Sequence, residues 1–275
     1  MPVIAVVGST VQDVVVLPGQ PAARAPGGTP LFALQALAAE GIEASAATRC
    51  ADASLAVPLV PLARPLCLRL DPAGVRSVLR YRPDGERDHE MPALGRAWST
   101  DDVLGWAAPA LREVRWVHAG TQTAGDLGEA LPALAGDGRS LALDAQGPLR
   151  APEAGPVRLL HRLDPAVLRH VRALKLSEEE AMAAFGTTDP AAIAARTGTP
   201  ETLVTLGWRG ALVHADGAMH EIRVEAVRGV NPTGAGDMFL AVYAGSRALG
   251  VAPHDAARRA CEAVRRALRA QASSA

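Results

Sequence analysis

Residues 230–244 read VNPTGAGDMFLAVYA, a loop of small residues that continues into an apolar segment long enough to form a buried helix. Gly234, Ala235 and Gly236 allow the backbone to approach a ligand closely, and free N–H groups at the start of a helix form a site for an anion such as phosphate. Asp237 falls in the first helical turn, where the helix dipole stabilises a carboxylate by only about 0.3–1 kcal/mol. The stretch fits either a phosphoryl-transfer site with Asp237 as the base or an ordinary helix start.

Upstream of this loop, short apolar segments alternate with longer segments of helical periodicity. This pattern predicts a doubly wound α/β fold in which helices flank a mostly parallel sheet, and we expect one domain over residues 1–275. In such sheets ligands bind beyond the carboxyl ends of the strands. The expected strands are Val3–Val7, Ala44–Thr48, Trp116–Ala119, Leu141–Asp144, Ala173–Leu176, Leu203–Leu206 and Ala211–His214, and the expected helices are Leu31–Ala39, Asp101–Leu111, Leu127–Leu134, Pro165–His170 and Glu178–Phe185.

One region departs from this alternation. Leu66–Leu70 and Val75–Tyr81 have polar residues between the apolar ones and are joined by the turn-forming sequence Asp71-Pro72-Ala73-Gly74. We expect a β-hairpin outside the main sheet here, followed by a loop over residues 82–96.

Composition excludes several classes of protein. The net charge of −1 gives no basic surface for nucleic acid or an anionic membrane, and the apolar stretch Ala53–Leu70 is interrupted by prolines, so no membrane span is expected. The cysteines, Cys50, Cys67 and Cys261, have no C-x-x-C spacing and the seven histidines have no metal-ligand spacing. Neither a disulfide framework nor a thiolate zinc site is indicated, which fits a cytoplasmic protein.

The segment Pro232-Thr233-Gly234-Ala235-Gly236-Asp237 resembles the C-terminal signature of the ribokinase/PfkB carbohydrate kinases. Further pieces of that family's pattern follow in the same order along nearly the whole chain: Val7-Gly8 with Asp13, Gly27-Gly28, Lys175–Glu180 and Thr205–Gly210. The resemblance implies a ribokinase-like fold with a reduced β lid, formed by about residues 14–26 and 64–90, that closes over a sugar. Because the segment between Asp13 and Gly27 is short, a monomer is favoured over a dimer built through the lid.

The resemblance also implies an ATP-dependent kinase and assigns roles to individual residues. Asp237 would be the general base, and the N–H groups of Gly234, Ala235 and Gly236 would hold the γ-phosphate. Glu180 would organise Mg²⁺, most simply through water. The residues that match the nucleotide-binding positions are Ser177, Thr205, Gly207, Gly210 and Gly236. Two plainer interpretations stay open: residues 205–210 also fit a hairpin turn, and a Ser followed by three Glu is also a helix cap.

The substrate side of the resemblance involves six residues: Asp13, Gly27, Gly28, Phe32, Gln146 and Arg150. A carboxylate such as that of Asp13 can accept hydrogen bonds from two neighbouring hydroxyls. Phe32 stands where ribokinase-like members have an Asn. The string from Asp144 to Arg150 resembles the Asp-x-Gln-x-x-x-Arg string of the inositol-kinase branch, so a cyclitol is the favoured acceptor. Gln146 and Arg150 would contact the substrate or the lid, or be structural.

Two alternative functions remain on the sequence. A nucleoside kinase of the same superfamily is one, with Phe32 or Trp98 stacking on the base. A ligand-binding homologue with impaired catalysis is the other, because Asn231 and Ser177 replace the Asp and Asn that many members carry.

Overall fold

The computed structural model describes residues 1–82, 87–227 and 230–274. Within these ranges the main body is a nine-stranded sheet with the order β14-β13-β12-β11-β9-β8-β1-β4-β5. Neighbouring strands from β5 to β12 are parallel, and β13 and β14 are antiparallel. The predicted α/β fold is confirmed. The strands are β1 (Ile4–Ser9), β4 (Ala44–Cys50), β5 (Leu66–Leu70), β8 (Trp116–Ala119), β9 (Ser140–Asp144), β11 (Ala173–Ser177), β12 (Glu201–Thr205), β13 (Ala211–Ala215) and β14 (Ala218–Ile222).

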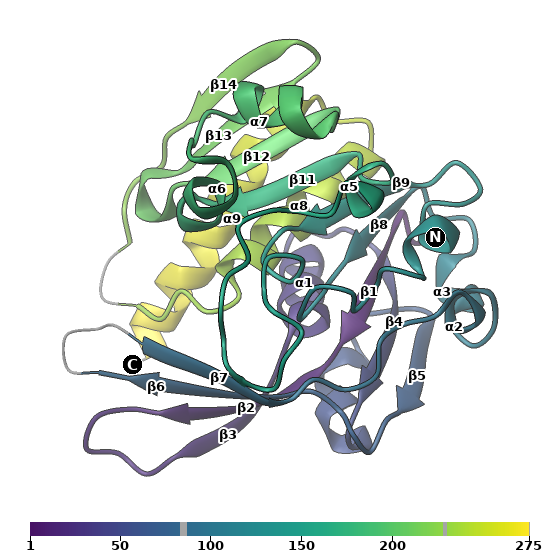
Figure 1. Cartoon of the computed structure of the whole chain (residues 1–275), viewed down its shortest axis with the longest axis vertical. Helices are drawn as coiled ribbons and strands as arrows, with labels where there is room; N and C mark the ends of the chain where they lie inside the picture. Colours follow the sequence, from purple (N-terminus) through teal and green to yellow (C-terminus); the bar gives the residue numbers. More distant parts are fainter. Residues whose placement is uncertain (83–86, 228–229, 275) are drawn as a thin grey trace.

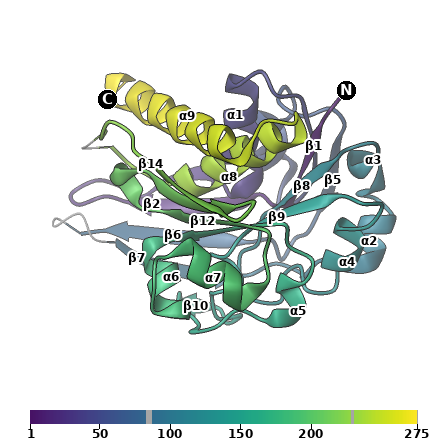
Figure 2. The same cartoon turned by 90° about the horizontal axis from the view of Figure 1, so that it is seen from above.

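Helices cover both faces of this sheet (Figure 2), with α1, α8 and α9 on one face and α2 to α7 on the other. Strand β1 shows why both faces must be covered: Ile4 and Val6 face one helical layer, while Ala5 and Val7 face the other. The α-helices are α1 (Thr29–Ala39), α2 (Thr100–Leu104), α3 (Ala108–Leu111), α4 (Leu131–Leu134), α5 (Pro165–Leu168), α6 (Glu178–Phe185), α7 (Pro190–Thr197), α8 (Ala235–Ala248) and α9 (Pro253–Ser274), and the 3₁₀ segments are Ala53–Leu59 and Gly207–Arg209.

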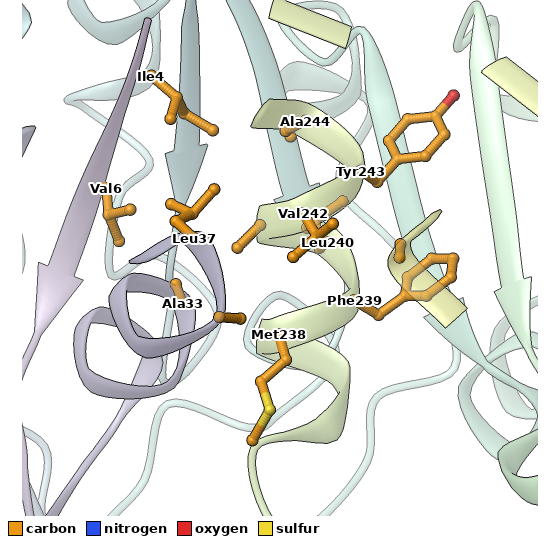
Figure 3. Close-up of a cluster of buried hydrophobic side chains, with 14 of the residues drawn as sticks. Ile4, Val6, Ala33, Leu37, Met238, Phe239, Leu240, Val242, Tyr243 and Ala244 are labelled. Atoms are coloured by element: carbon orange, nitrogen blue, oxygen red, sulfur yellow. The ribbon is translucent and has the colours of Figure 1, made fainter. Parts of the chain in front are cut away.

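The apolar segment quoted first, residues 238–244, is the centre of helix α8. Every one of its side chains is buried, and it packs beside α1 (Figure 3), over β1, β8 and β9. Leu37 of α1 and Leu240 of α8 are both fully buried in this layer. Burial of this whole segment fixes the position of α8, and hence of the loop that precedes it.

A second sheet has the order β10-β7-β6-β2-β3 and extends from one end of the main sheet (Figure 1). Its strands are β2 (Val11–Val16), β3 (Ala23–Gly27), β6 (Arg76–Tyr81), β7 (Arg87–Ala93) and β10 (Gly155–Pro156). We call it the small sheet. Of the two segments predicted to form a lid, it contains the strands within residues 14–26 and, from residues 64–90, only residues 76–81 and 87–90, because residues 66–70 belong to the main sheet. Residues 83–86 of the second segment lie outside the described ranges.

The expected hairpin between residues 66–70 and 75–81 is wrong. Strand β5 pairs in parallel with β4 at the edge of the main sheet, whereas β6 pairs with β2 and β7 in the small sheet. The chain crosses between the sheets at Asp71, whose carboxylate accepts the N–H groups of Ala73 and Arg96 and so stabilises the crossing. The loop expected over residues 82–96 is also wrong, because Arg87–Ala93 is β7.

Three predicted helices are shorter than expected, of which α5 ends at Leu168 rather than at His170. The segment 101–111 forms two helices because α2 ends at Gly105 and α3 begins next to Pro109. Of the segment 127–134 only α4 is helical, since Gly128 lies in the turn before it. No helix among the described residues has the length and apolar composition needed to cross a membrane.

Candidate active site

A polar cavity of about 320 Å³ lies where the carboxyl ends of β9, β11 and β12 meet the small sheet and the start of α8. This is the edge at which parallel sheets bind ligands. The structure brings eleven of the predicted site residues to its wall: Asp13, Gly28, Phe32, Gln146, Arg150, Ser177, Glu180, Thr205, Gly234, Gly236 and Asp237.

The start of α8 presents free N–H groups to this cavity. Gly234 is the N-cap residue and has a φ of 81°, a left-handed conformation that favours glycine. No described residue accepts a hydrogen bond from the N–H groups of Gly234, Gly236 or Asp237. The N–H of Ala235 instead donates to the carbonyl oxygen of Pro232 at 3.0 Å, so Ala235 is not available for the role predicted for it. The anion site therefore consists of the other three N–H groups.

The Asp237 carboxyl is held beside these N–H groups. The Thr29 hydroxyl, at the start of α1, donates to Asp237 Oδ1 at 2.6 Å. Burial, together with the nearby Asp144 carboxylate, raises the pKa of Asp237 to about 6, against the opposing effects of the Thr29 hydrogen bond and the Lys175 charge. A carboxyl group with this pKa is ionised at neutral pH and remains basic enough to accept a proton.

A buried ion pair lies beneath the same helix start. Lys175 Nζ donates to Asp144 Oδ2 at 2.9 Å, and the two residues are register partners on β11 and β9. A Cβ at Gly236 would lie 2.7 Å from Lys175 Nζ, so a side chain there would displace the ammonium group. Although burial disfavours the charged form, the Asp144 and Glu180 carboxylates raise the pKa of Lys175. Sequence reasoning gave Lys175 no role, although it is the only lysine in the chain.

The small sheet supplies the opposite wall. Burial raises the pKa of Asp13 to about 6, although hydrogen bonding to Ser77 and the Arg150 charge oppose the shift. Ser77 Oγ also lies 3.1 Å from His89 Nε2, and burial beside Arg150 and Arg87 lowers the pKa of His89 to about 3. His89 is therefore neutral. Gly27 lies directly against the Asp13 carboxylate and leaves no room for a side chain.

Contacts join the small sheet to the loop before α8. The Tyr81 hydroxyl donates to Asn231 Oδ1 at 3.1 Å and lies 3.2 Å from Thr233 Oγ1. Arg87 Nη1 donates to Thr233 Oγ1 at 3.3 Å. Asn231 Oδ1 also accepts the N–H of Thr233 at 3.0 Å, so a neutral amide organises this loop where many members of the resembled family carry Asp.

A second, mainly apolar groove of about 340 Å³ adjoins the polar cavity at Thr205 and Gly236. The predicted nucleotide-binding residues Gly207 and Gly210 line it, together with Ala235. Its apolar wall comes from α8, α9 and the segment after β14 and includes Val224, Val230, Phe239, Val264 and Leu268. Thr205 and Gly210 also flank the connection between the antiparallel strands β12 and β13. Residues 205–210 therefore both form a hairpin connection and line the groove.

Ser177 and Glu180 form a capping box at the start of α6. Ser177 Oγ accepts the N–H of Glu180 at 3.2 Å, and Glu180 Oε2 accepts the N–H of Ser177 at 2.7 Å. The interpretation of this Ser and the three Glu as a helix cap is therefore correct. Both side chains also line the polar cavity, together with Glu179.

The arrangement of the carboxylates in the cavity shows which kind of magnesium site they could form. Within residues 1–82, 87–227 and 230–274, no group of three or more His, Cys, Asp or Glu side chains is arranged to hold a metal ion. Magnesium is commonly bound by only one or two carboxylates together with water and substrate phosphates. Glu179 and Glu180, which line the cavity, are carboxylates of the kind that such an ion binds.

Trp98 does not reach the polar cavity. It is 1% exposed, packs against Trp106 with the two ring centroids 5.1 Å apart and the ring planes tilted by 35°, and lies beneath the Arg49 guanidinium in the core. The expectation that Trp98 could stack on a nucleoside base is wrong, whereas Phe32 does line the cavity.

Comparisons with known proteins agree with this fold. Residues 152–270 match the family model described as pfkB family carbohydrate kinase. Among solved structures, a pyrophosphate-dependent kinase in the ribokinase family, complexed with a pyrophosphate analog and myo-inositol, is 21% identical with a TM-score of 0.81 over 97% of this chain and 95% of that chain. A search of curated proteins gives no match.

Two further structures have the same fold. The Arabidopsis thaliana ribokinase complexed with ribose and ATP is 19% identical with a TM-score of 0.75, over 98% of this chain and 93% of that chain. The Burkholderia thailandensis nucleoside kinase in complex with inosine is 19% identical with a TM-score of 0.68, over 95% and 89%. The predicted ribokinase-like fold is confirmed, and the predicted resemblance to the PfkB carbohydrate kinases is matched by the family model over residues 152–270.

Proposed function

We propose that this chain, which has the ribokinase-like fold and matches the pfkB carbohydrate kinase family over residues 152–270, transfers the γ-phosphoryl group of ATP to a hydroxyl of a small polyol or sugar. A cyclitol such as inositol is the favoured acceptor. The observation that carries the proposal is the Asp237 carboxyl, which faces a polar cavity next to the free N–H groups of Gly234 and Gly236. These are the base and the anion site that phosphoryl transfer requires.

In the proposed reaction, the acceptor hydroxyl loses its proton to Asp237 and its oxygen forms a bond to the γ-phosphorus. The bond between that phosphorus and the oxygen bridging to the β-phosphate breaks, and ADP leaves. The N–H groups of Gly234, Gly236 and Asp237 donate to the phosphate oxygens as charge moves onto them. Mg²⁺ held through water by Glu179 and Glu180 would neutralise part of the charge on the donor phosphates.

The apolar groove supports a nucleotide as donor rather than pyrophosphate. It adjoins Gly236, at the donor end of the site, and its wall includes Phe239, Val264 and Leu268. A planar base would bury apolar surface there, whereas pyrophosphate has none to bury. A similar kinase of the same fold is described as pyrophosphate-dependent, so the donor must be tested directly.

The acceptor side of the polar cavity suits a compact molecule with several hydroxyls. Asp13 can accept from two neighbouring hydroxyls, and Gln146 can both donate and accept. The small sheet, as the proposed lid, would exclude water from the reacting groups. A nucleoside is the second candidate acceptor because the Phe32 ring lines the cavity and could stack on a base.

The decisive experiment is a coupled assay of nucleotide turnover with purified protein, ATP and a panel of cyclitols, aldoses, ketoses and nucleosides. The wild-type chain should turn over at least one acceptor, and Asp237→Asn should lower kcat by about 10³-fold with the Kd for ATP nearly unchanged. Asp126→Asn is the matched control, because Asp126 is also buried with a raised pKa but lies outside both cavities.

An Asp237→Asn variant that retains kcat would refute the role of the base. ATP binding without turnover of any acceptor would instead support the impaired, ligand-binding homologue. A monomeric state and a cytoplasmic location stay predictions; the free cysteines, of which Cys50 and Cys261 are buried, are compatible with a reducing compartment.

A further inference from the structure

Arg150 is held rigidly at the wall of the polar cavity. It follows β9, its N–H donates to the Gly147 carbonyl at 2.9 Å, and its own carbonyl accepts the N–H of Ala124 at 2.9 Å. The preceding residue, Leu149, is fully buried and anchors the segment in the core. The backbone thus fixes the point from which the Arg150 side chain enters the cavity.

The Arg150 guanidinium lacks a protein partner. Arg150 is 8% exposed, yet among the described residues its side chain makes neither an ion pair nor a hydrogen bond. Arg49, which is also 8% exposed, pairs with Asp102 and donates to the carbonyl oxygens of Arg96 and Ala97. Buried arginines ordinarily have such partners, because an unpaired charge away from water is costly.

The groups around Arg150 show where its charge acts. Its charge acts on the Glu180, Asp144 and Asp237 carboxylates, which come from α6, β9 and α8, and on Asp13, His89 and Arg87 of the small sheet. None of the carboxylates is within ion-pairing distance, and Asp144 is already paired with Lys175. Arg150 therefore shares one cavity with both the proposed acceptor-binding carboxylate of Asp13 and the proposed base Asp237, and its charge acts on both.

The occupant of the cavity has to supply acceptors for this guanidinium. Its N–H groups only donate, and it stays charged at every pH of interest. Hydroxyls of a neutral polyol would satisfy some of the N–H groups but would leave the charge uncompensated. The oxygens of a phosphoryl group accept hydrogen bonds from the N–H groups and also compensate the positive charge, and a planar guanidinium can bind two of these oxygens at once.

We propose that Arg150 is a catalytic residue of this kinase, whose guanidinium donates to the oxygens of the phosphoryl group in transit, opposite the N–H groups at the start of α8. This proposal rests on the proposed function, since it takes the acceptor as neutral and the donor as a phosphate. Arg150 then neutralises the charge on the γ-phosphoryl oxygens while the acceptor proton moves to Asp237 and the bond to ADP breaks.

The test compares Arg150→Gln with Arg150→Lys and the wild-type chain. Arg150→Gln should lower kcat by about 10²- to 10³-fold while the KM values for acceptor and ATP change less than threefold. Arg150→Lys should recover only part of the loss, because an ammonium cannot bind two oxygens as a fork. Removing an unpaired buried charge should leave Tm unchanged or raise it, whereas the matched variant Arg49→Gln should lower Tm.

A binding measurement makes the result independent of turnover. Calorimetry with ADP, Mg²⁺ and aluminium fluoride, a mimic of the phosphoryl group in transit, should show at least a tenfold weaker affinity for Arg150→Gln than for wild type, with the affinity for ADP alone unchanged. Equal affinities for the aluminium fluoride complex would overturn the proposal, as would a loss confined to the acceptor KM. A lowered Tm with retained kcat would show a structural role.

The two proposals fail in different ways. If the wild-type chain turns over no acceptor, the proposed function fails, and the aluminium fluoride comparison still decides whether Arg150 contacts a phosphoryl mimic. If the wild-type chain is active and Arg150→Gln retains kcat, the Arg150 proposal fails while the kinase assignment stands.

Discussion

The Thr29 hydroxyl donates to Asp237 Oδ1 at 2.6 Å and so joins residues 208 positions apart in the chain. Thr29 is the first residue of α1, and Asp237 lies in the first turn of α8. These helices pack side by side on one face of the main sheet (Figure 3), so burial of their apolar faces sets the distance between hydroxyl and carboxyl. The position of the proposed base is thus determined by the core as well as by its own loop.

The first prediction concerns this hydrogen bond. Thr29→Val removes the hydroxyl but keeps the shape of the side chain, and a carboxylate that loses a donor has a higher pKa. We expect the acidic limb of the pH profile of kcat/KM to move to higher pH and kcat at the plateau to fall about tenfold. Thr29→Ser should behave like wild type. An unchanged profile in Thr29→Val would show that the hydroxyl does not act on the base.

The second prediction is the pH dependence of the wild-type reaction. Burial beside Asp144 raises the pKa of Asp237 to about 6, and the base must be ionised to accept a proton. The rate constant kcat/KM should therefore be low at pH 4.5, rise through an apparent pKa near 6 and level off above pH 7. The pKa of Asp13 is also about 6, so the acidic limb of the kcat/KM profile reports the ionisation of both Asp13 and Asp237. The pH profile of kcat alone is compared with it to distinguish the two groups. A rate that stays constant from pH 5 to pH 8 would contradict this assignment.

The sequence predicted the main sheet better than the small one, for a physical reason. Strands such as β1 are buried on both faces and show as continuous apolar runs, whereas β7, RDHEMPA, has one buried residue and no apolar pattern. The pairing between β4 and β5 was also not predicted from the sequence, because the polar residues in and after Leu66–Leu70 suggested a hairpin with Val75–Tyr81. These strands depend on long-range pairing that no local pattern records.

In the site, too, the features with a local sequence pattern were predicted and those that depend on long-range contacts were not. The loop before α8 was found because its small residues and its Asp are contiguous. Thr29, Lys175 and Ser77 were missed because each acts through a partner distant in sequence, namely Asp237, Asp144 and His89. The hydrogen bond from the Ala235 N–H to the Pro232 carbonyl depends on the geometry of the turn, which the composition of the loop does not determine.

The third prediction tests the donor groove. Val264 of α9 lines the apolar groove, and Val264→Trp should fill the space proposed for the base. We expect the KM for ATP to rise at least tenfold, with the acceptor KM nearly unchanged and kcat at saturating ATP within about threefold of wild type. Val264→Ala, which leaves the groove open, should change the KM for ATP much less. If Val264→Trp leaves donor use unchanged, and pyrophosphate replaces ATP in the wild-type reaction, the groove is not the donor site.

The fourth prediction concerns stability and Asp126, which lies outside both cavities. Burial raises the pKa of Asp126 to about 6, although its carboxylate accepts the N–H of Gln122 at 3.0 Å. A group with a raised folded pKa contributes stability that is fully present below its unfolded pKa and is lost as the pH rises through the folded one. Asp126 therefore lowers the free energy of unfolding by up to about 3 kcal/mol between pH 4 and pH 7.

Asp126→Asn keeps the acceptor for Gln122 but does not titrate. In urea unfolding, the variant should gain stability relative to wild type as the pH rises from 4 to 7, and the gain should level off above pH 7. Ser246→Ala, which removes a buried hydroxyl and no ionisable group, should differ from wild type by the same amount at every pH. If the difference between Asp126→Asn and wild type is also independent of pH, the Asp126 carboxyl is not perturbed by burial, and the same desolvation argument for Asp237 loses its support.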